Sequence, residues 1–366
     1  MPPYDPCWCG SGRKWKFCHK LREAEAPLAR AVLQNFSFEN AANRSICLHP
    51  FAPTGCSQTI AKAHTVQRNR SLAAIAEGGH VLSVKDGMKY SRTSDALKPK
   101  MVGVRQASTF RGFCQTHDHQ LFRTIEVGEI EINETSAFQF GFRSLCYELF
   151  QKHSGLETMR FLRDNLDRGK NFLIQNQIQQ EAHMAIHGFE AAISDFSIYK
   201  NRFDAYFKNE MNDRFNFYTE VFDTNLPIAI STAFNPEHGF SGQNLQNMNV
   251  PIGKLELLCL NLSAVNGKTY LNFGWFGEPD GPNARFVSEF AALPPNRKFD
   301  AILILAFEFT EHIFIRPSWW RELSQAQRNE LIARCPNTPG SHSAECLDLG
   351  KANYSDVSPS QVHSNV

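Results

Sequence analysis

The sequence predicts an α+β, multi-domain protein in which two small metal-binding units precede a helical region, which is followed by an antiparallel sheet. Three observations support this fold class. Six of the ten cysteines and six of the thirteen histidines lie before residue 130. Apolar residues then recur at helical spacing from about 134 to 222. Beyond 228, short apolar runs separated by turn residues indicate strands.

The composition is that of a globular chain with an uneven distribution of charge. Apolar residues make up 42% of the 366 residues, and no apolar run approaches the roughly 20 residues needed to span a bilayer. We therefore expect a cytoplasmic protein without a membrane segment. Residues 1–130 contain 18 Lys and Arg against 10 Asp and Glu, a balance of +8, while 131–366 contain 20 against 27, a balance of −7. This asymmetry indicates either a polyanionic partner for the front half or merely solvated surfaces.

The first metal-binding unit spans residues 1–20 and contains Cys7, Cys9, Cys18 and His19. Zinc prefers four thiolate or imidazole ligands in a tetrahedron. The intervening Gly10-Ser11-Gly12 lets the backbone turn tightly around an ion. Because so short a segment cannot bury enough surface to fold alone, we expect zinc to supply its folding free energy.

Residues 5–20 resemble the SEC-C motif, a zinc knuckle that occurs at the end of the preprotein translocase ATPase and in many otherwise unrelated bacterial proteins. The resemblance lies in the ligand spacing, the Gly-Ser-Gly and the basic and aromatic run from Arg13 to Phe17. It implies zinc and a small recognition surface. It does not imply secretion, since the sequence contains no Gly-x-x-x-x-Gly-Lys-Ser/Thr phosphate loop of an ATPase motor.

A second unit spans residues 37–127, and its expected zinc ligands are Cys47, Cys56, Cys114 and His117. Two ligand pairs from distant segments are the layout of a treble-clef-like zinc site. The alternative is a set of separate buried thiols and surface histidines. Within this unit, we expect a helix from about Gln58 to Glu77 and an exposed lysine-rich loop over 85–100.

Residues 44–122 also resemble the HNH nuclease family, through Ala63-His64-Thr65-Val66 and the closing element Cys114-Gln115-Thr116-His117-Asp118. The resemblance implies that His64 is the general base that activates water. It places Asp118 where the family has a ligand of the catalytic metal, with His119 as a nearby substitute. Bound Mg²⁺ or Mn²⁺ would polarise a phosphodiester there.

The chain departs from the HNH pattern at three points, one of which is the long linker between the two halves of the motif. Ala63 stands where most members have an acidic residue before the base, and 109–112 offers no Asn before the closing element. A zinc-stabilised unit without nuclease chemistry is therefore the open alternative.

Residues 134–335 are expected to form a larger domain of unassigned role. Leu156, Met159 and Leu162 recur at helical steps, and two or three long amphipathic helices fit the segment 134–222. Strands are expected over 228–234, 255–262 and 269–276, the last two joined by a hairpin turn at Asn266-Gly267. A short helix is expected to end near Cys335, and 336–366 reads as a flexible tail.

The function indicated by these features is zinc-dependent interaction with nucleic acid, DNA or RNA, through residues 1–130. The HNH-like unit makes metal-dependent endonuclease activity a hypothesis. The alternative is a non-catalytic adaptor whose knuckle binds a protein or ribosomal partner and whose second zinc only stabilises the fold. The two hypotheses differ at His64, which an adaptor would bury or use as a zinc ligand.

Overall fold

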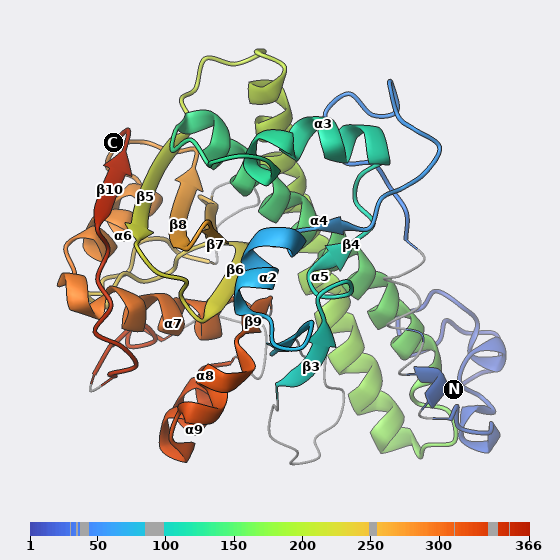
Figure 1. Ribbon diagram of the computed structural model, residues 1–366. Coiled ribbons are helices and arrows are strands. Elements are labelled where there is room, and N and C mark those ends of the chain that lie inside the picture. The colour runs from blue at the N-terminus through green and yellow to red at the C-terminus, as the bar shows by residue number, and fades with distance from the viewer. Residues whose placement is uncertain are drawn as a thin grey trace. The chain divides into compact units, whose positions relative to one another are not determined.

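The computed structural model describes residues 1–29, 31–33, 36, 44–84, 99–248, 255–310, 312–335, 343–350 and 352–366 (Figure 1). The chain divides into two compact units. The first consists of residues 1–45 and 149–197, and the second of residues 46–148 and 198–366. The knuckle therefore belongs to the same unit as the helical segment 149–197, and most of the second metal-binding unit belongs to the same unit as the sheet. The sequence predicts separate domains over residues 1–20, 37–127 and 134–335, and whether these segments fold independently stays a prediction.

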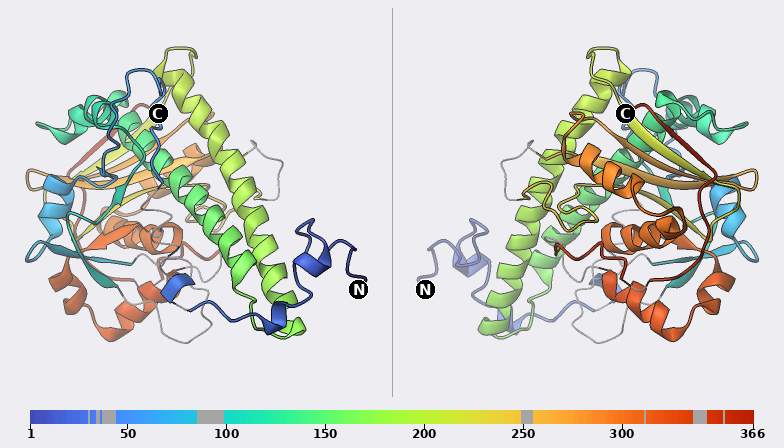
Figure 2. Two further views of the ribbon diagram at one scale, coloured as in Figure 1. Left: turned by 90° about the vertical axis from the view of Figure 1, so that its right-hand side faces the viewer. Right: turned by 90° about the vertical axis from the view of Figure 1, so that its left-hand side faces the viewer.

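The first unit is built on two long helices, α4 (Glu134–Asn165) and α5 (Phe172–Phe207), both of which continue into the second unit. Side chains of Asn133 and Asn171 accept backbone N–H groups at the helix starts and so act as caps. Between residues 149 and 197 the two helices pack side by side (Figure 2) through Leu156, Met159, Leu162, Ala182 and Ile186. The apolar spacing expected for this helical region is thereby confirmed.

The second unit contains an antiparallel sheet whose strand order is β10-β5-β8-β7-β6-β9-β2-β3 within the described part of the chain. The strands are β2 (His80–Ser83), β3 (Lys100–Gly103), β5 (Asn216–Phe222), β6 (Ile228–Phe234), β7 (Leu258–Val265), β8 (Lys268–Trp275), β9 (Ile313–Ile315) and β10 (Gln361–Ser364). A separate two-stranded pair is formed by β1 (Ala63–His64) and β4 (Thr109–Phe110). The described helices of this unit are α2 (Ala73–Ile75), α3 (Gln115–Glu126), α6 (Pro282–Ala291), α7 (Lys298–Phe309), α8 (Pro317–Glu322) and α9 (Gln325–Arg334).

The predicted hairpin between β7 and β8 is confirmed. Val265 pairs with Lys268 across the two-residue turn, and Asn266 and Gly267 have φ angles of 52° and 82°. Two consecutive positive φ angles are what a type I′ turn requires, and Asn-Gly tolerates them best. The strand expected over 228–234 is present as β6, and α9 is the short helix that ends just before Cys335.

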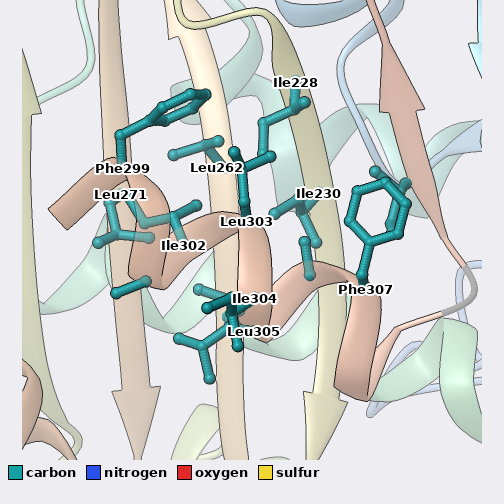
Figure 3. Packing of buried hydrophobic residues seen from close by; sticks show 14 of the residues in the cluster. Ile228, Ile230, Leu262, Leu271, Phe299, Ile302, Leu303, Ile304, Leu305 and Phe307 are labelled. Carbon is teal, nitrogen blue, oxygen red and sulfur yellow. The ribbon is translucent and has the colours of Figure 1, made fainter. Parts of the chain in front are cut away.

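The main core lies on one face of this sheet, where α7 packs across the central strands (Figure 3). Leu303 and its neighbours in α7 contact Ile230 of β6 and Leu262 of β7. Side chains alternate along a strand, so Ser231 and Asn261 point to the opposite face. There, Ser144 of α4 hydrogen-bonds to Ser231 Oγ at 2.9 Å and to Asn261 Oδ1 at 3.1 Å. The sheet is therefore covered on both faces.

Three expectations are corrected by the structure. The segment 58–77 is not one helix but strand β1, a single wide helical turn over Arg68–Leu72, and α2, because backbone groups such as the N–H of Thr65 bond to the segment around Ser108. Residues 216–222 form β5 rather than helix, since both strand neighbours pair with them.

The expectation of a flexible tail over 336–366 is also corrected for its described residues. β10 pairs with β5, and the side chains of Leu347 and Tyr354 are buried in the main core. The lysine-rich loop falls largely on 85–98, outside the described residues. Among the helices that the structure describes, none combines the length and apolar character needed to cross a membrane.

Candidate zinc sites

The first candidate site is a tight loop that folds back on itself. Gly10 and Gly12 adopt φ angles of 72° and 71°, where a side chain would be strained. The N–H of Cys7 donates to the carbonyl of Arg13 at 2.8 Å and closes the loop. A single turn of helix over Trp15–Phe17 then delivers the second ligand pair to the first.

The four expected ligands come together in this loop. The Nδ1 atom of His19 lies 3.2 Å from Cys7 Sγ and 3.1 Å from Cys18 Sγ, and the sulfurs of Cys9 and Cys18 are 3.6 Å apart. All four ligand atoms lie within 4.8 Å of one another. Bond lengths to tetrahedral zinc predict separations of about 3.6 to 3.8 Å. The donor set and its spacing therefore fit one zinc ion, which Cys7, Cys9, Cys18 and His19 would hold.

The electrostatics of this site favour ionised ligands. Burial raises the pKa of Cys9, but hydrogen bonds with His19 and Ser11 outweigh it and lower that pKa to about 6. Burial lowers the pKa of His19, whereas its hydrogen bond to Asp167 and the neighbouring thiolates raise it to about 11. An ion binding here must displace the imidazole proton, so zinc affinity should fall as the pH falls.

The second candidate site is assembled at the N-terminus of α3. Cys114 is the residue before the helix, and its Sγ accepts the backbone N–H of His117. The strand-like segment with Cys47 is held beside it because the N–H of Leu48 donates to the carbonyl of Gly112 at 2.8 Å. His117 Nδ1 then lies 3.4 Å from Cys47 Sγ and 3.5 Å from Cys56 Sγ.

These separations again match a tetrahedral zinc ion bound by three thiolates and one imidazole. Both ligand sets expected from the sequence are therefore brought together, and the chain is a zinc-binding protein with two Cys/His clusters that could hold ions. One supporting residue was missed. His49 stacks on His117 with ring centroids 3.8 Å apart, and burial followed by the His117 charge lowers the pKa of His49 to about 4.

His64 belongs to neither cluster. It lies in β1, opposite Thr109 of β4, and its Nδ1 is 3.3 Å from Ser108 Oγ. Its side chain is half-buried, and burial together with the charges of Arg68 and Arg143 lowers its pKa to about 4. The imidazole is therefore neutral at pH 7, and it also hydrogen-bonds to the backbone of Ala107.

Asp118 lies in the first turn of α3 and is half-buried. Its Oδ1 atom is buried without a hydrogen-bond partner, and burial raises the pKa of this carboxyl. The charges of Arg143 and Glu126 act on both Asp118 and His64, and these two charged residues form an ion pair of 2.6 Å. His119 is exposed. Among the described residues, His64, Asp118 and His119 are absent from the groups of three or more close metal-ligand atoms.

The comparisons with known proteins concern the first site. Residues 5–20 match the family model described as the SEC-C motif, which includes all four ligands of that site. Neither a curated protein nor a solved structure matches the chain. The match confirms the resemblance of the knuckle to this motif.

Proposed function

We propose that this zinc-binding protein contacts nucleic acid, DNA or RNA, through the basic residues 1–130, and that its HNH-like unit at 44–122 is a metal-dependent endonuclease. The observation that carries this proposal is the common environment of His64 and Asp118. They come from separate elements, β1 and α3, yet the same Arg143 and Glu126 charges act on both. The second cluster takes its ligands Cys114 and His117 from the start of α3 and would hold this element in place.

The chemistry available to these residues suits phosphodiester hydrolysis. Neutral His64 can accept a proton from water at pH 7, since its pKa is about 4. Asp118 offers a buried carboxylate oxygen that has no other partner, and together with exposed His119 it would hold a divalent cation. Mg²⁺ or Mn²⁺ bound there would polarise the phosphodiester and stabilise the developing negative charge.

The knuckle supplies features that favour a polyanion. Lys16 Nζ lies 3.8 Å from the centroid of the Tyr4 ring and 4.4 Å from that of Phe17, and Lys14 Nζ lies 5.4 Å from Tyr4. Tyr4 and Phe17 are both more than 60% exposed. Exposed rings beside ammonium groups can stack on bases while the lysines contact phosphates.

A protein or ribosomal partner is the second candidate, which would make the chain a non-catalytic adaptor. Phe172, Leu173 and Ile174 at the start of α5 are all exposed, Leu173 to 76%. Phe172 also contacts the Trp8 ring of the knuckle at 5.2 Å between centroids. Contiguous exposed apolar side chains favour a protein surface over a phosphate backbone. For either function we propose a cytoplasmic location, where cysteines stay reduced and can act as zinc ligands.

The experiment that separates the two functions uses the zinc-loaded full-length protein. It is incubated with single- and double-stranded DNA and RNA, with Mg²⁺, with Mn²⁺ or with chelator, and cleavage and binding are both measured. Cation-dependent cleavage supports the endonuclease. Salt-sensitive binding without cleavage keeps nucleic-acid recognition and discards the hydrolysis. Failure to bind any of the nucleic acids at low salt contradicts the proposal and favours the adaptor.

A further inference from the structure

Both nitrogen atoms of the His19 imidazole have polar partners. Its Nδ1 faces the sulfurs of Cys7 and Cys18, while its Nε2 donates a hydrogen bond of 2.8 Å to Oδ2 of Asp167. Asp167 lies in the connection between α4 and α5, 148 residues along the chain from His19, and its side chain is fully buried. A histidine whose Nε2 carries the proton must present Nδ1 to the metal.

We propose that Asp167 is a positioning residue of the first zinc site, and that zinc bound there stabilises the end of the α4–α5 helix pair. A carboxylate that accepts the second N–H of a zinc-bound histidine fixes the ring and its tautomer and increases the basicity of the ligand. Asp167 occupies this position. Because it belongs to the helix connection rather than to the knuckle, zinc binding and the structure of this connection are coupled.

Asp167 is itself held rigidly. Its Oδ2 also accepts a hydrogen bond of 2.8 Å from Gln179 of α5, and its Oδ1 accepts one of 2.7 Å from Nε of Arg22. Arg22 further donates to the backbone carbonyl of Asp164 near the end of α4. The carboxylate is therefore fixed between the knuckle and both helices, and it cannot rotate away from His19 without leaving buried donors unpaired.

A second set of contacts joins the same elements independently of Asp167. The Nε2–H of His183 in α5 donates to the backbone carbonyl of Cys9, one of the four ligands of the first site. The N–H of Gly169 in the connection donates to the carbonyl of Arg22 at 3.0 Å. Loss of zinc would release Cys9 and His19, and with them the partners of His183 and Asp167.

The first test measures zinc affinity by competition with a chromophoric chelator on the full chain. Asp167→Asn removes the charge but keeps the shape, and we expect about 10- to 100-fold weaker binding of one of the two ions. Asp164→Asn is the matched control, because Asp164 lies three residues earlier, at the end of α4, and its side chain pairs with Arg163 rather than with this network; this variant should bind both ions normally. Gln179→Leu provides a milder variant, with a smaller loss in the same direction, if Asp167→Asn does not fold.

A double-mutant cycle separates positioning of the ligand from general stabilisation. In His19→Cys, a thiolate replaces the imidazole, so there is no ring for Asp167 to orient. Adding Asp167→Asn to this variant should then leave zinc affinity unchanged. An equal loss of affinity with and without His19 would overturn the positioning role, as would unchanged affinity in Asp167→Asn alone.

Hydrogen exchange followed by mass spectrometry tests the coupling. Cys9→Ser should accelerate exchange in residues 160–185, whereas Cys47→Ser, which disables the second site, should not. If Cys9→Ser leaves exchange in this segment at the wild-type rate, zinc does not stabilise the helix connection and the coupling is refuted.

Discussion

Substitution of His64 by alanine tests the proposed hydrolysis most directly. The change removes the contact of 3.3 Å between His64 Nδ1 and Ser108 Oγ and the hydrogen bond between His64 and the backbone of Ala107. Ser108 Oγ still donates to the carbonyl of Val66 and accepts its N–H, so Ser108 stays hydrogen-bonded. The expected loss of stability is about 0.5–1.5 kcal/mol for each hydrogen bond removed. The loss of a general base lowers a rate about 10²- to 10⁴-fold, so cleavage should become undetectable in a fold that survives.

The assay follows cleavage of a fluorescent oligonucleotide with Mg²⁺ or Mn²⁺, alongside metal quantification and thermal unfolding. His64→Ala should retain both zinc ions, since His64 is in neither cluster. His363→Ala, an exposed histidine in β10, is the matched control and should cleave normally. Retained cleavage in His64→Ala, or the loss of a zinc ion from it, would refute the assignment of His64 as the base.

Four further measurements address the pH dependence, the cation site, the zinc content and the nucleic-acid contact. Cleavage by the wild type should persist as the pH falls below 6.5 and decline only as it approaches about 4, because the lowered pKa keeps His64 unprotonated over that range; a midpoint near 6.5 in the pH–rate profile would contradict this. Asp118→Ala should abolish cleavage that added Mn²⁺ cannot restore, and rescue by Mn²⁺ would place the cation elsewhere. Metal analysis should find two zinc ions per chain, with one lost from each of Cys9→Ser and Cys47→Ser; a wild-type value near one would remove one site. Nucleic-acid affinity should fall steeply as salt is raised, because neutralised phosphates release counterions, and a flat salt titration would exclude phosphate contact.

The ligand sets could be predicted from the sequence because the chemistry of the residue types is itself the signal. Cys and His clustered in a reduced chain have few other uses than metal binding, and Gly10 and Gly12 mark the tight loop between ligands without reference to the rest of the fold. The Asn266-Gly267 hairpin was equally accessible, since the turn depends on the backbone freedom of two adjacent residues.

Other features were decided only by contacts between distant segments. Residues 216–222 have a pattern that reads as helix, yet they form β5 because β8 and β10 both pair with them. The described end of the tail is ordered for the same reason, since β10 completes the edge of the sheet beside β5. Strand pairing depends on the partner that folding provides, and local propensity is only a weak guide to it.

The first zinc site likewise depends on both local sequence and long-range contacts. Cys7, Cys9, Cys18 and His19 follow from a span of thirteen residues, so the sequence by itself determined the first zinc site. Nothing in that span points to Asp167, a single carboxylate 148 residues farther along the chain. Only the tertiary structure decided that this carboxylate meets His19, because packing of α4 against α5 carries it to the knuckle and buries it there.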